Sequence, residues 1–194
     1  MDRERLEQAV RSFVEAIGER FDGDDLARTP SRVAKAWHDD LLSGYAVDPD
    51  EALTWTDAPE RSGLVVVRDV RFASVCVHHL LPFVGRAHVA YLPDRRLAGL
   101  SKLGRVVDAH ARRLQIQERL TGEIADTIER VLRPRAVLVM LEAEHTCMTL
   151  RGVRKESSRL STVAARGQYD TDPGARREAL DLFASNRDPS SLSR

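Results

Sequence analysis

The chain has 194 residues and a mass of 21.7 kDa, enough for one ordinary domain with a small helical appendage. Its 30 basic and 30 acidic residues cancel, which argues against a nucleic-acid binder that relies on overall charge but leaves room for a local cationic pocket. Hydrophobic residues make up 42% of the chain, enough to bury a real core, so global disorder is excluded.

Membrane and secretory signals are not apparent in the sequence. No apolar run approaches the length of a membrane span. The segment MDRERLEQAV is charged from its second residue, and no signal-peptide core follows it. The two cysteines lie far apart and do not make a disulfide framework. We therefore expect a soluble, reduced, cytoplasmic globular protein.

Residues 1–45 are expected to form an N-terminal helical segment. Apolar residues recur with helical spacing over residues 2–18. A second helix is expected to start with Thr29 as its N-cap and Pro30 in its first turn, to run to about Leu42, and to end at Gly44. Asp, Pro, Glu and Gly then dominate, and this composition predicts a connector over residues 46–63.

The main domain is expected over residues 64–185, followed by a disordered polar tail over residues 186–194. Strand patterns are followed by two helical ones, then by two more strands and a last helix. The expected strands are 64–72, 84–92, 136–141 and 147–153; the expected helices begin at 101 and 116, and the last spans 172–183. Strands in hairpin pairs predict an α+β layer, an antiparallel sheet with helices on one face.

Cysteine and histidine gather in two short segments. The first holds Cys76, His78 and His79, and the second, some seventy residues later, holds His145 and Cys147. A turn brings Cys76 and His79 together, and Cys147 would add a third ligand of a kind that suits Zn²⁺. Three protein ligands leave a coordination position open, as in catalytic zinc sites. The alternative, equally compatible with the spacing, is that both cysteines are small buried hydrophobes.

The second cluster and the helix start near residue 117 carry two further candidates. His145 and Cys147 are expected on one strand with their side chains on the same face, so that His145 would transfer protons beside the metal. Gln117 and Glu118 open a helix, and a carboxylate there can accept two hydrogen bonds from the amidine edge of guanine. The alternatives are a structural histidine at a strand end and an ordinary acid favoured by the helix dipole.

Anion-binding residues surround the helix start at Ser101. The segment GLSK precedes that helix, and a helix N-terminus with a nearby lysine is an anion site. Lys102 and Arg105 project from one side of its first turn. The other basic candidates are Arg32, Arg151 and Arg154. Together these groups would hold a polyphosphate, whereas each alone is more simply explained as a solvated surface charge.

Seven segments in this order and spacing resemble GTP cyclohydrolase I over roughly residues 26–183. They are TPSRVAKAW, CVHHLLPFVG, VAYLP, GLSKLGRVV, RRLQIQERLT, AEHTCM and RGVRK. The resemblance implies the tunnelling fold, an antiparallel sheet with helices on one face. It also implies a homodecamer of two pentamers, with active sites at subunit interfaces.

The resemblance implies zinc-dependent conversion of GTP and water to 7,8-dihydroneopterin triphosphate and formate, the first step toward folate and related pterins. Matched by position, the zinc ligands are Cys76, His79 and Cys147, the catalytic histidines are His78 and His145, and the purine-reading pair is Gln117 and Glu118. The matched triphosphate contacts are Ser101, Lys102, Arg105 and Arg151, with Arg32 joining from a neighbouring subunit.

Two segments depart from the family pattern. Val77 stands where the family usually has a glutamate, and the segment SSRLSTVAARGQY (157–169) replaces part of a Thr/Ser-rich stretch with the apolar residues Leu160, Val163 and Ala164. Two alternatives to a GTP cyclohydrolase I therefore stay open. One is a diverged paralogue that acts on a related purine nucleotide in a specialised pathway. The other is a non-catalytic zinc-binding protein of the same fold, against which the retained His78, His145, Gln117 and Glu118 count.

Overall fold

A five-stranded sheet is the centre of the fold in the computed structural model, which describes residues 1–21 and 23–185 apart from the side chains of 24 and 25. The strand order is β5-β2-β3-β6-β7. All neighbours are antiparallel except the short parallel pair of β5 with the end of β2. The strands are β2 (Val65–Cys76), β3 (Pro82–Leu92), β5 (Leu114–Gln115), β6 (Ala136–His145) and β7 (Leu160–Gly167).

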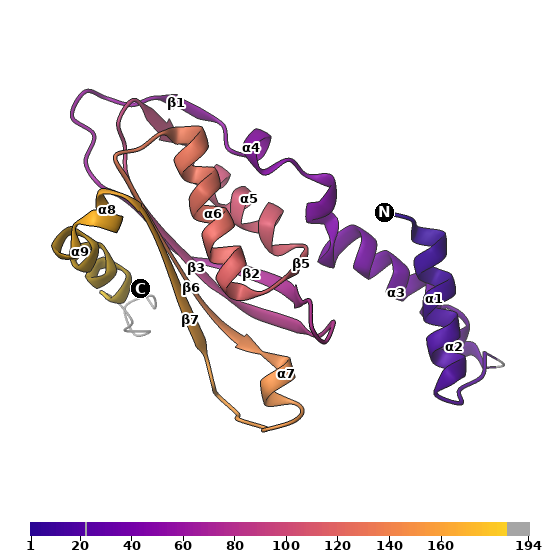
Figure 1. The fold of residues 1–194 in the computed structure, drawn as a ribbon. Coiled ribbons are helices and arrows are strands. Elements are labelled where there is room, and N and C mark those ends of the chain that lie inside the picture. The colour runs from indigo at the N-terminus through magenta and orange to yellow at the C-terminus, as the bar shows by residue number, and fades with distance from the viewer. Residues whose placement is uncertain (22, 186–194) are drawn as a thin grey trace, which may run out of the picture.

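Two long helices cover one face of this sheet (Figure 1). They are α5 (Leu100–Ala111) and α6 (Gln117–Leu132), and both are amphipathic. Every second residue of the central strands, such as Val89 and Val139, points toward these helices and lies in the main core. The most deeply buried helix side chains in this core are Leu103, Val106, Leu120, Ile124, Ile128 and Leu132.

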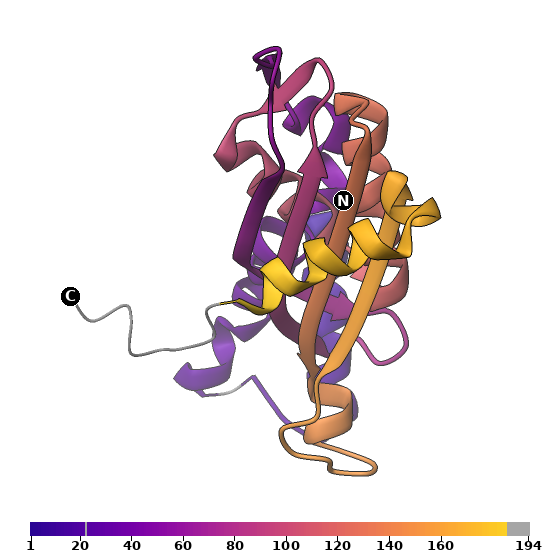
Figure 2. The same cartoon turned by 90° about the vertical axis from the view of Figure 1, so that its left-hand side faces the viewer.

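The opposite face of the sheet carries the end of the described chain. After the turn α8 (Gln168–Thr171), helix α9 (Pro173–Ala184) crosses this face, as Figure 2 shows. Tyr169 and Phe183 pack there against Ala90 and Leu138, the strand residues that point away from the main core. The predicted last helix is confirmed, with Asp172 accepting hydrogen bonds from its first turn as the N-cap.

The N-terminal helical segment projects to one side of the sheet (Figure 1). Its elements are α1 (Arg3–Ala16), α2 (Asp24–Ala27), α3 (Thr29–Lys35), a π-helix (Ala36–Leu41), a 3₁₀ turn (Ser43–Ala46) and α4 (Pro49–Ala52). The second expected helix is thus regular only to Lys35 and continues as a π-helix, and Arg28 rather than Thr29 is its N-cap. A small two-stranded sheet follows, formed by β1 (Trp55–Asp57) and β4 (Arg96–Ala98).

The predicted fold class is confirmed, but the last strand lies elsewhere than expected. Residues 147–153 are not a strand: α7 (Thr146–Thr149) is a single helical turn, and a loop follows it. The chain turns here because the Thr146 hydroxyl donates to the Pro82 carbonyl at 2.6 Å and Leu150 N–H donates back to Thr146. The fourth long strand is β7, which pairs with β6 along the sheet edge.

The boundaries at residues 45 and 63 stay predictions, and the predicted disordered tail at 186–194 lies outside the described residues. Among the helices of the described chain, none is both long enough and apolar enough to span a membrane.

Candidate active site and metal centre

The two cysteine–histidine segments meet at one end of the sheet. Strand β2 ends at Cys76, and residues 77–79 form a tight turn closed by hydrogen bonds from the amides of His79 and Leu80 to the Cys76 carbonyl. The turn places Cys76 Sγ 3.8 Å from His79 Nδ1. Cys147, on α7, completes the group, and the three ligand atoms lie within 4.8 Å of one another.

The donor set of this trio fits zinc. Two thiols and one imidazole are borderline-soft ligands, and a tetrahedral zinc holds neighbouring S and N atoms roughly 3.5 Å apart. The 3.8 Å between Cys76 Sγ and His79 Nδ1 is close to that separation. Cys76 is buried and His79 is exposed, so the trio spans the boundary between core and solvent. His78 lies beside it, with Nδ1 4.0 Å from Cys76 Sγ.

His145 is the last residue of β6 and is held on two sides. Its ring stacks on Phe83, with centroids 4.4 Å apart and planes 8° from parallel. Its Nε2 lies 2.9 Å from Oε1 of Gln117, the first residue of α6. His145 and Cys147 do not share a strand face as expected, because the strand ends between them; the turn of α7 still keeps Cys147 close to the site.

The buried Gln117 amide determines which His145 nitrogen carries a proton. The Gln117 side chain has no exposed surface, and its Nε2 donates to the carbonyls of Leu141 (3.1 Å) and Leu160 (2.9 Å). These carbonyls can only accept, so the amide oxygen must face His145. The ring Nε2 of His145 must then be the donor. Nδ1 is therefore the ring atom that can accept or deliver a proton.

Burial perturbs the two titratable groups nearest to this point. It lowers the pKa of the His145 imidazole, while the negative charge of Glu118 partly opposes that shift. It also raises the pKa of the Cys147 thiol, and the neighbouring Cys76 acts in the same direction. Glu118, next to Gln117 on α6, is exposed, so its carboxylate is accessible to a ligand.

The predicted phosphate contacts are not gathered beside the trio within one chain. Ser101, Lys102 and Arg105 lie in the first turns of α5, and the chain reaches the metal turn only after that helix, at β5. A helix of this length spans about 18 Å. Arg151 follows α7 and lies close enough to Cys147 to affect its pKa, whereas Arg32 is on α3, which projects away from the sheet (Figure 1).

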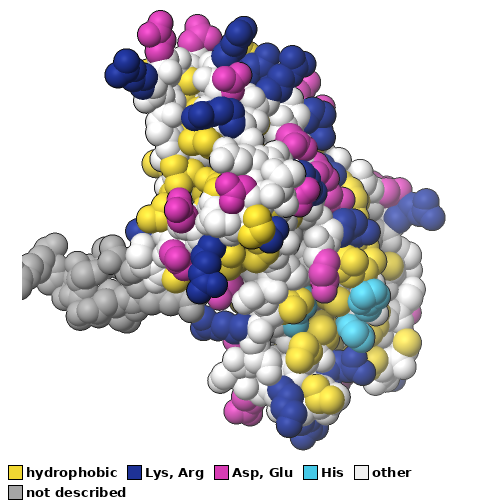
Figure 3. Space-filling model, turned by 60° about the vertical axis from the view of Figure 1, so that its left-hand side comes forward, with side chains coloured by type: hydrophobic (Ala, Val, Ile, Leu, Met, Phe, Trp, Pro, Cys, Tyr) yellow, Lys and Arg dark blue, Asp and Glu magenta, His cyan; other side chains and the backbone are white. Residues whose placement is uncertain are grey.

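The surface around the trio is unusually apolar. Leu80, Leu150 and Val153 expose 52%, 72% and 66% of their surface, and the departure Val77 exposes 38%. Figure 3 shows histidine side chains at the surface among hydrophobic ones. Such a patch on the isolated chain is typical of a surface that another molecule covers.

Sequence reasoning missed the residues that support the site from within. Phe83 stacks on His145, and Thr162 on β7 lies 3.1 Å from the Gln117 amide nitrogen. Gln115 is 2% exposed and pairs with Cys76 across the β2–β5 ladder. The one available signal was the motif QIQ, in which two amides flank Ile116 just before the α6 helix.

Comparison with known proteins gives matches to one family over nearly the whole chain. The family model described as GTP cyclohydrolase I matches residues 6–184. The chain is 49% identical over 184 residues to GTP cyclohydrolase 1 of Mycolicibacterium vanbaalenii, covering 94% of this chain and 91% of that one. It is 46% identical over 188 residues to GTP cyclohydrolase 1 of Caldanaerobacter subterraneus subsp. tengcongensis, covering 96% and 100%.

A weaker structural likeness is to the archaeosine synthase QueF-Like in the apo form, with a TM-score of 0.47 and 19% identity over 55% of this chain and 96% of that chain. Since the family model spans nearly the whole chain and the sequence identities extend over nearly its full length, the chain belongs to the GTP cyclohydrolase I family of enzymes.

Proposed function

We propose that the chain hydrolyses GTP at C8 and rearranges the product to 7,8-dihydroneopterin triphosphate, with release of formate, as the first step of folate and pterin biosynthesis. The observation that carries this proposal is the meeting of the Cys76–His79–Cys147 trio with His145, whose ring is oriented by Gln117. Family membership supports GTP as the substrate.

Cys76, His79 and Cys147 would hold zinc, and their number leaves a coordination position open. When bound, zinc would act as a Lewis acid that activates water near neutral pH. The chain supplies the remaining chemistry. The partly buried His145, protonated at Nδ1, would donate that proton to the purine imidazole and so make C8 electrophilic. Its lowered pKa makes the imidazolium a stronger proton donor.

Substrate orientation would come from charged groups at both ends of the nucleotide. The exposed Glu118 carboxylate would accept two hydrogen bonds from the guanine edge, beside the proton-transferring His145. Arg151 would hold the triphosphate from the same chain. Holding both ends fixes the reacting carbon in place, which lowers the entropic part of the barrier.

The other phosphate contacts would come from neighbouring subunits. Ser101 and Lys102 lie at the end of α5 far from the metal turn, with Arg105 one turn further along, and the patch around the trio is exposed on the isolated chain. A homo-oligomer, proposed to be a decamer of two pentamers, would cover this patch and bring those residues and Arg32 to the site. Lysine and arginine there would neutralise the triphosphate charge.

The first test is an assay of the purified, zinc-loaded protein with GTP, following formate release and pterin fluorescence after oxidation. Two variants separate the roles of the site. Cys147→Ala is expected to lose both zinc and turnover, and His145→Ala to retain zinc while losing turnover. Formate together with pterin from the wild type, and neither from the variants, would support the proposal.

A panel of other purine nucleotides under the same conditions tests the substrate. GTP is expected to have the highest kcat/KM. A zinc-loaded wild type that releases neither product from GTP would contradict the proposed activity, and faster turnover of another purine would favour the diverged paralogue suggested by Val77.

A further inference from the structure

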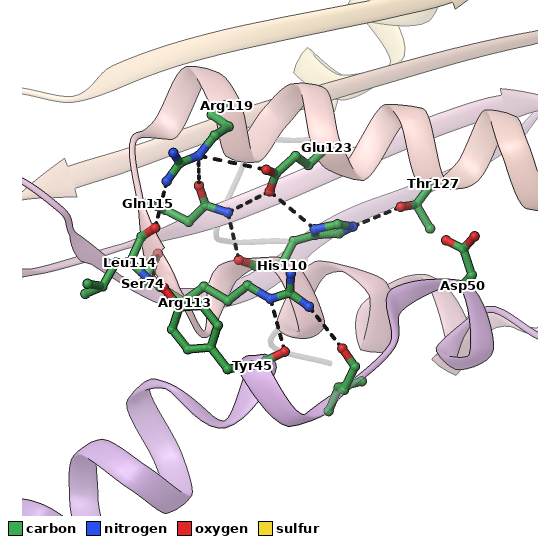
Figure 4. Close-up of polar contacts among 12 residues, drawn as sticks. Tyr45, Asp50, Ser74, His110, Arg113, Leu114, Gln115, Arg119, Glu123 and Thr127 are labelled. Atoms are coloured by element: carbon green, nitrogen blue, oxygen red, sulfur yellow. Dashed lines mark hydrogen bonds and ion pairs between the residues drawn. The ribbon is translucent and has the colours of Figure 1, made fainter. Parts of the chain in front are cut away.

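A buried polar network lies directly behind the metal turn, between α5, α6 and β5 (Figure 4). Within the described residues, the buried polar side chains are Ser74, His88, His110, Gln115, Gln117, Thr121 and Thr127. All except His88 lie in or next to either this network or the Gln117–His145 contact. Buried polar groups are therefore concentrated on the elements that support the proposed site, rather than spread through the core.

Gln115 is the centre of this network, and its side-chain amide is fully used. Its Nε2 donates to the His110 carbonyl at 3.1 Å and to Glu123 Oε2 at 2.7 Å. Its Oε1 accepts from Arg119 Nε at 2.8 Å. Both amide hydrogens and the amide oxygen thus have partners, from the end of α5 and from two turns of α6. The Gln115 side chain has one arrangement that satisfies all of them.

The backbone of Gln115 holds the metal turn. Gln115 pairs with Cys76 in the parallel β2–β5 ladder, and its carbonyl accepts a 3.0 Å hydrogen bond from the Val77 amide. Two residues later Gln117 begins α6 and bonds His145. One residue therefore connects the turn that carries Cys76 and His79 to the helix that orients the proposed acid–base group.

Glu123 stabilises this arrangement from the other side. The Glu123 carboxylate lies 3.4 Å from His110 Nδ1, and His110 Nε2 lies 2.9 Å from the Thr127 hydroxyl. Arg119 also donates to the Leu114 carbonyl at 2.7 Å, on the other residue of β5. The Gln115 amide is fully hydrogen-bonded in this network, whereas within the described chain His110 Nδ1 faces the Glu123 carboxylate without a hydrogen bond. Removal of the Gln115 amide would leave its donors and acceptors without partners.

We propose that Gln115 is a positioning residue for the metal centre, holding the Cys76–His79 turn in register with the start of α6. This role rests on the proposed function, because it presumes that the trio binds zinc. The amide fixes the turn through the backbone and contacts neither metal nor substrate. Removal of groups that orient metal ligands typically weakens metal affinity about 10- to 100-fold.

The test compares Gln115→Ala with Ile128→Val, a core variant on α6 that lies about 16 Å along that helix from Gln117. Zinc affinity is measured by competition with a chelator. The geometry of the ligands is followed through the visible spectrum of the Co²⁺-substituted protein, and the hydrogen bond of the Val77 amide through its rate of hydrogen exchange. Gln115→Ala is expected to weaken zinc binding about 10-fold or more, to shift the Co²⁺ bands and to speed Val77 exchange. Ile128→Val should change none of the three.

A pair of variants distinguishes a specific effect on the metal site from a general loss of stability. Gln115→Glu places a carboxylate against Glu123 and should weaken zinc binding. Adding Glu123→Gln restores a donor–acceptor pair at that contact and keeps the bond to Arg119, so the double variant should recover part of the zinc affinity. Recovery through a second site is not expected of a general loss of stability.

Two results are unfavourable, and they differ. If wild type binds zinc and Gln115→Ala binds it equally tightly with an unchanged Co²⁺ spectrum, the positioning role is wrong while the metal site stands. If the folded wild type binds no zinc at all, the proposed metal centre is wrong, and this role falls with it.

Discussion

Gln117 and Glu118 are neighbours in the sequence but occupy different environments. The Gln117 amide is fully buried and bonded to two carbonyls and to His145, whereas Glu118 is exposed at the helix start. The family resemblance treats both as a purine-reading pair, and that role stays a prediction. Their contacts suggest a division of labour, in which Gln117 orients the proton-transferring ring and Glu118 meets the base.

This division predicts that a substitution at Gln117 mainly lowers kcat, whereas a substitution at Glu118 mainly raises KM. Gln117→Met keeps the length of the side chain but frees His145 to rotate, so kcat should fall about 100-fold with a smaller change in KM. Glu118→Gln removes a charge-assisted contact to substrate, so KM for GTP should rise about 10-fold or more. Steady-state kinetics of both variants make the comparison. A rise in KM as the main effect of Gln117→Met would instead support direct base recognition.

His110 is expected to make the stability of the fold depend on pH. Burial lowers its pKa; Glu123 opposes that shift, and Arg113 and Arg130 reinforce it. The positive charge of a protonated His110 would also contribute to the lowered pKa of Asp50 on α4. Because the folded state resists protonation of His110, the unfolded state binds the proton more readily below about pH 6.5. The contribution of His110 to stability is therefore present at neutral pH and decreases as the pH falls.

His110→Gln tests this linkage, since glutamine can still hydrogen-bond but does not titrate. Urea unfolding at about pH 7.5 and about pH 5.5 should show a smaller loss of stability on acidification in the variant than in wild type. Other histidines and carboxylates titrate in both proteins, so they cancel in the comparison. An equal or larger loss in the variant would contradict the expected direction.

At the scale of elements, the N-terminal segment docks on the sheet domain through a close backbone approach. Gly44, in the 3₁₀ turn, donates its N–H to the Arg112 carbonyl at 3.0 Å, at the end of α5. A Cβ there would lie 2.5 Å from the Ala109 carbonyl oxygen and 2.8 Å from that of Arg112. The glycine expected only to end a helix therefore also allows this turn and α5 to touch.

Gly44→Ala is expected to destabilise the fold by about 1–3 kcal/mol, because backbone atoms on both sides must move apart. Gly63→Ala is the matched control, since nothing lies within 4 Å of a Cβ at that position. The control should be neutral or slightly stabilising. Chemical denaturation of both variants provides the measurement, and equal stability of the two would show that the contact does not hold the segment.

At the scale of the whole molecule, one chain holds the two halves of the proposed site at separate places. The trio and His145 lie at the end of the sheet near β5, and Lys102 lies at the far end of α5. The exposed apolar surface of Leu80, Leu150 and Val153 lies next to the trio rather than next to Lys102. A complete site would therefore need at least two copies of the chain.

A decamer predicts a mass of about ten times 21.7 kDa by light scattering, and interfacial sites predict complementation. Cys147→Ala and Lys102→Ala should each be inactive alone. After co-expression, random mixing should leave about a quarter of the sites with both intact residues, and activity should return to that extent. Mixed oligomers that stay inactive would place both residues in the same chain's site.

Much of the fold and half of the site could be predicted from the sequence by itself. The helices α5 and α6 follow from apolar residues at helical spacing, the strand β2 from its run of valines, and β3 from its alternation. The C-x-x-H spacing correctly predicted that Cys76 and His79 meet. Such features depend on a few neighbouring residues, whose backbone preferences and periodicity are encoded locally.

Only the tertiary structure decided the elements and contacts that depend on distant partners. Strand β7 was missed because it lies at the sheet edge, half exposed, without clean alternation, and α7 is a single turn too short to show a period. The partners of Gln115 and Gln117 come from α5, α6, β6 and β7, which meet only when the helices pack on the sheet. A buried amide finds its acceptors through packing, and the spacing of residues along the chain does not record that.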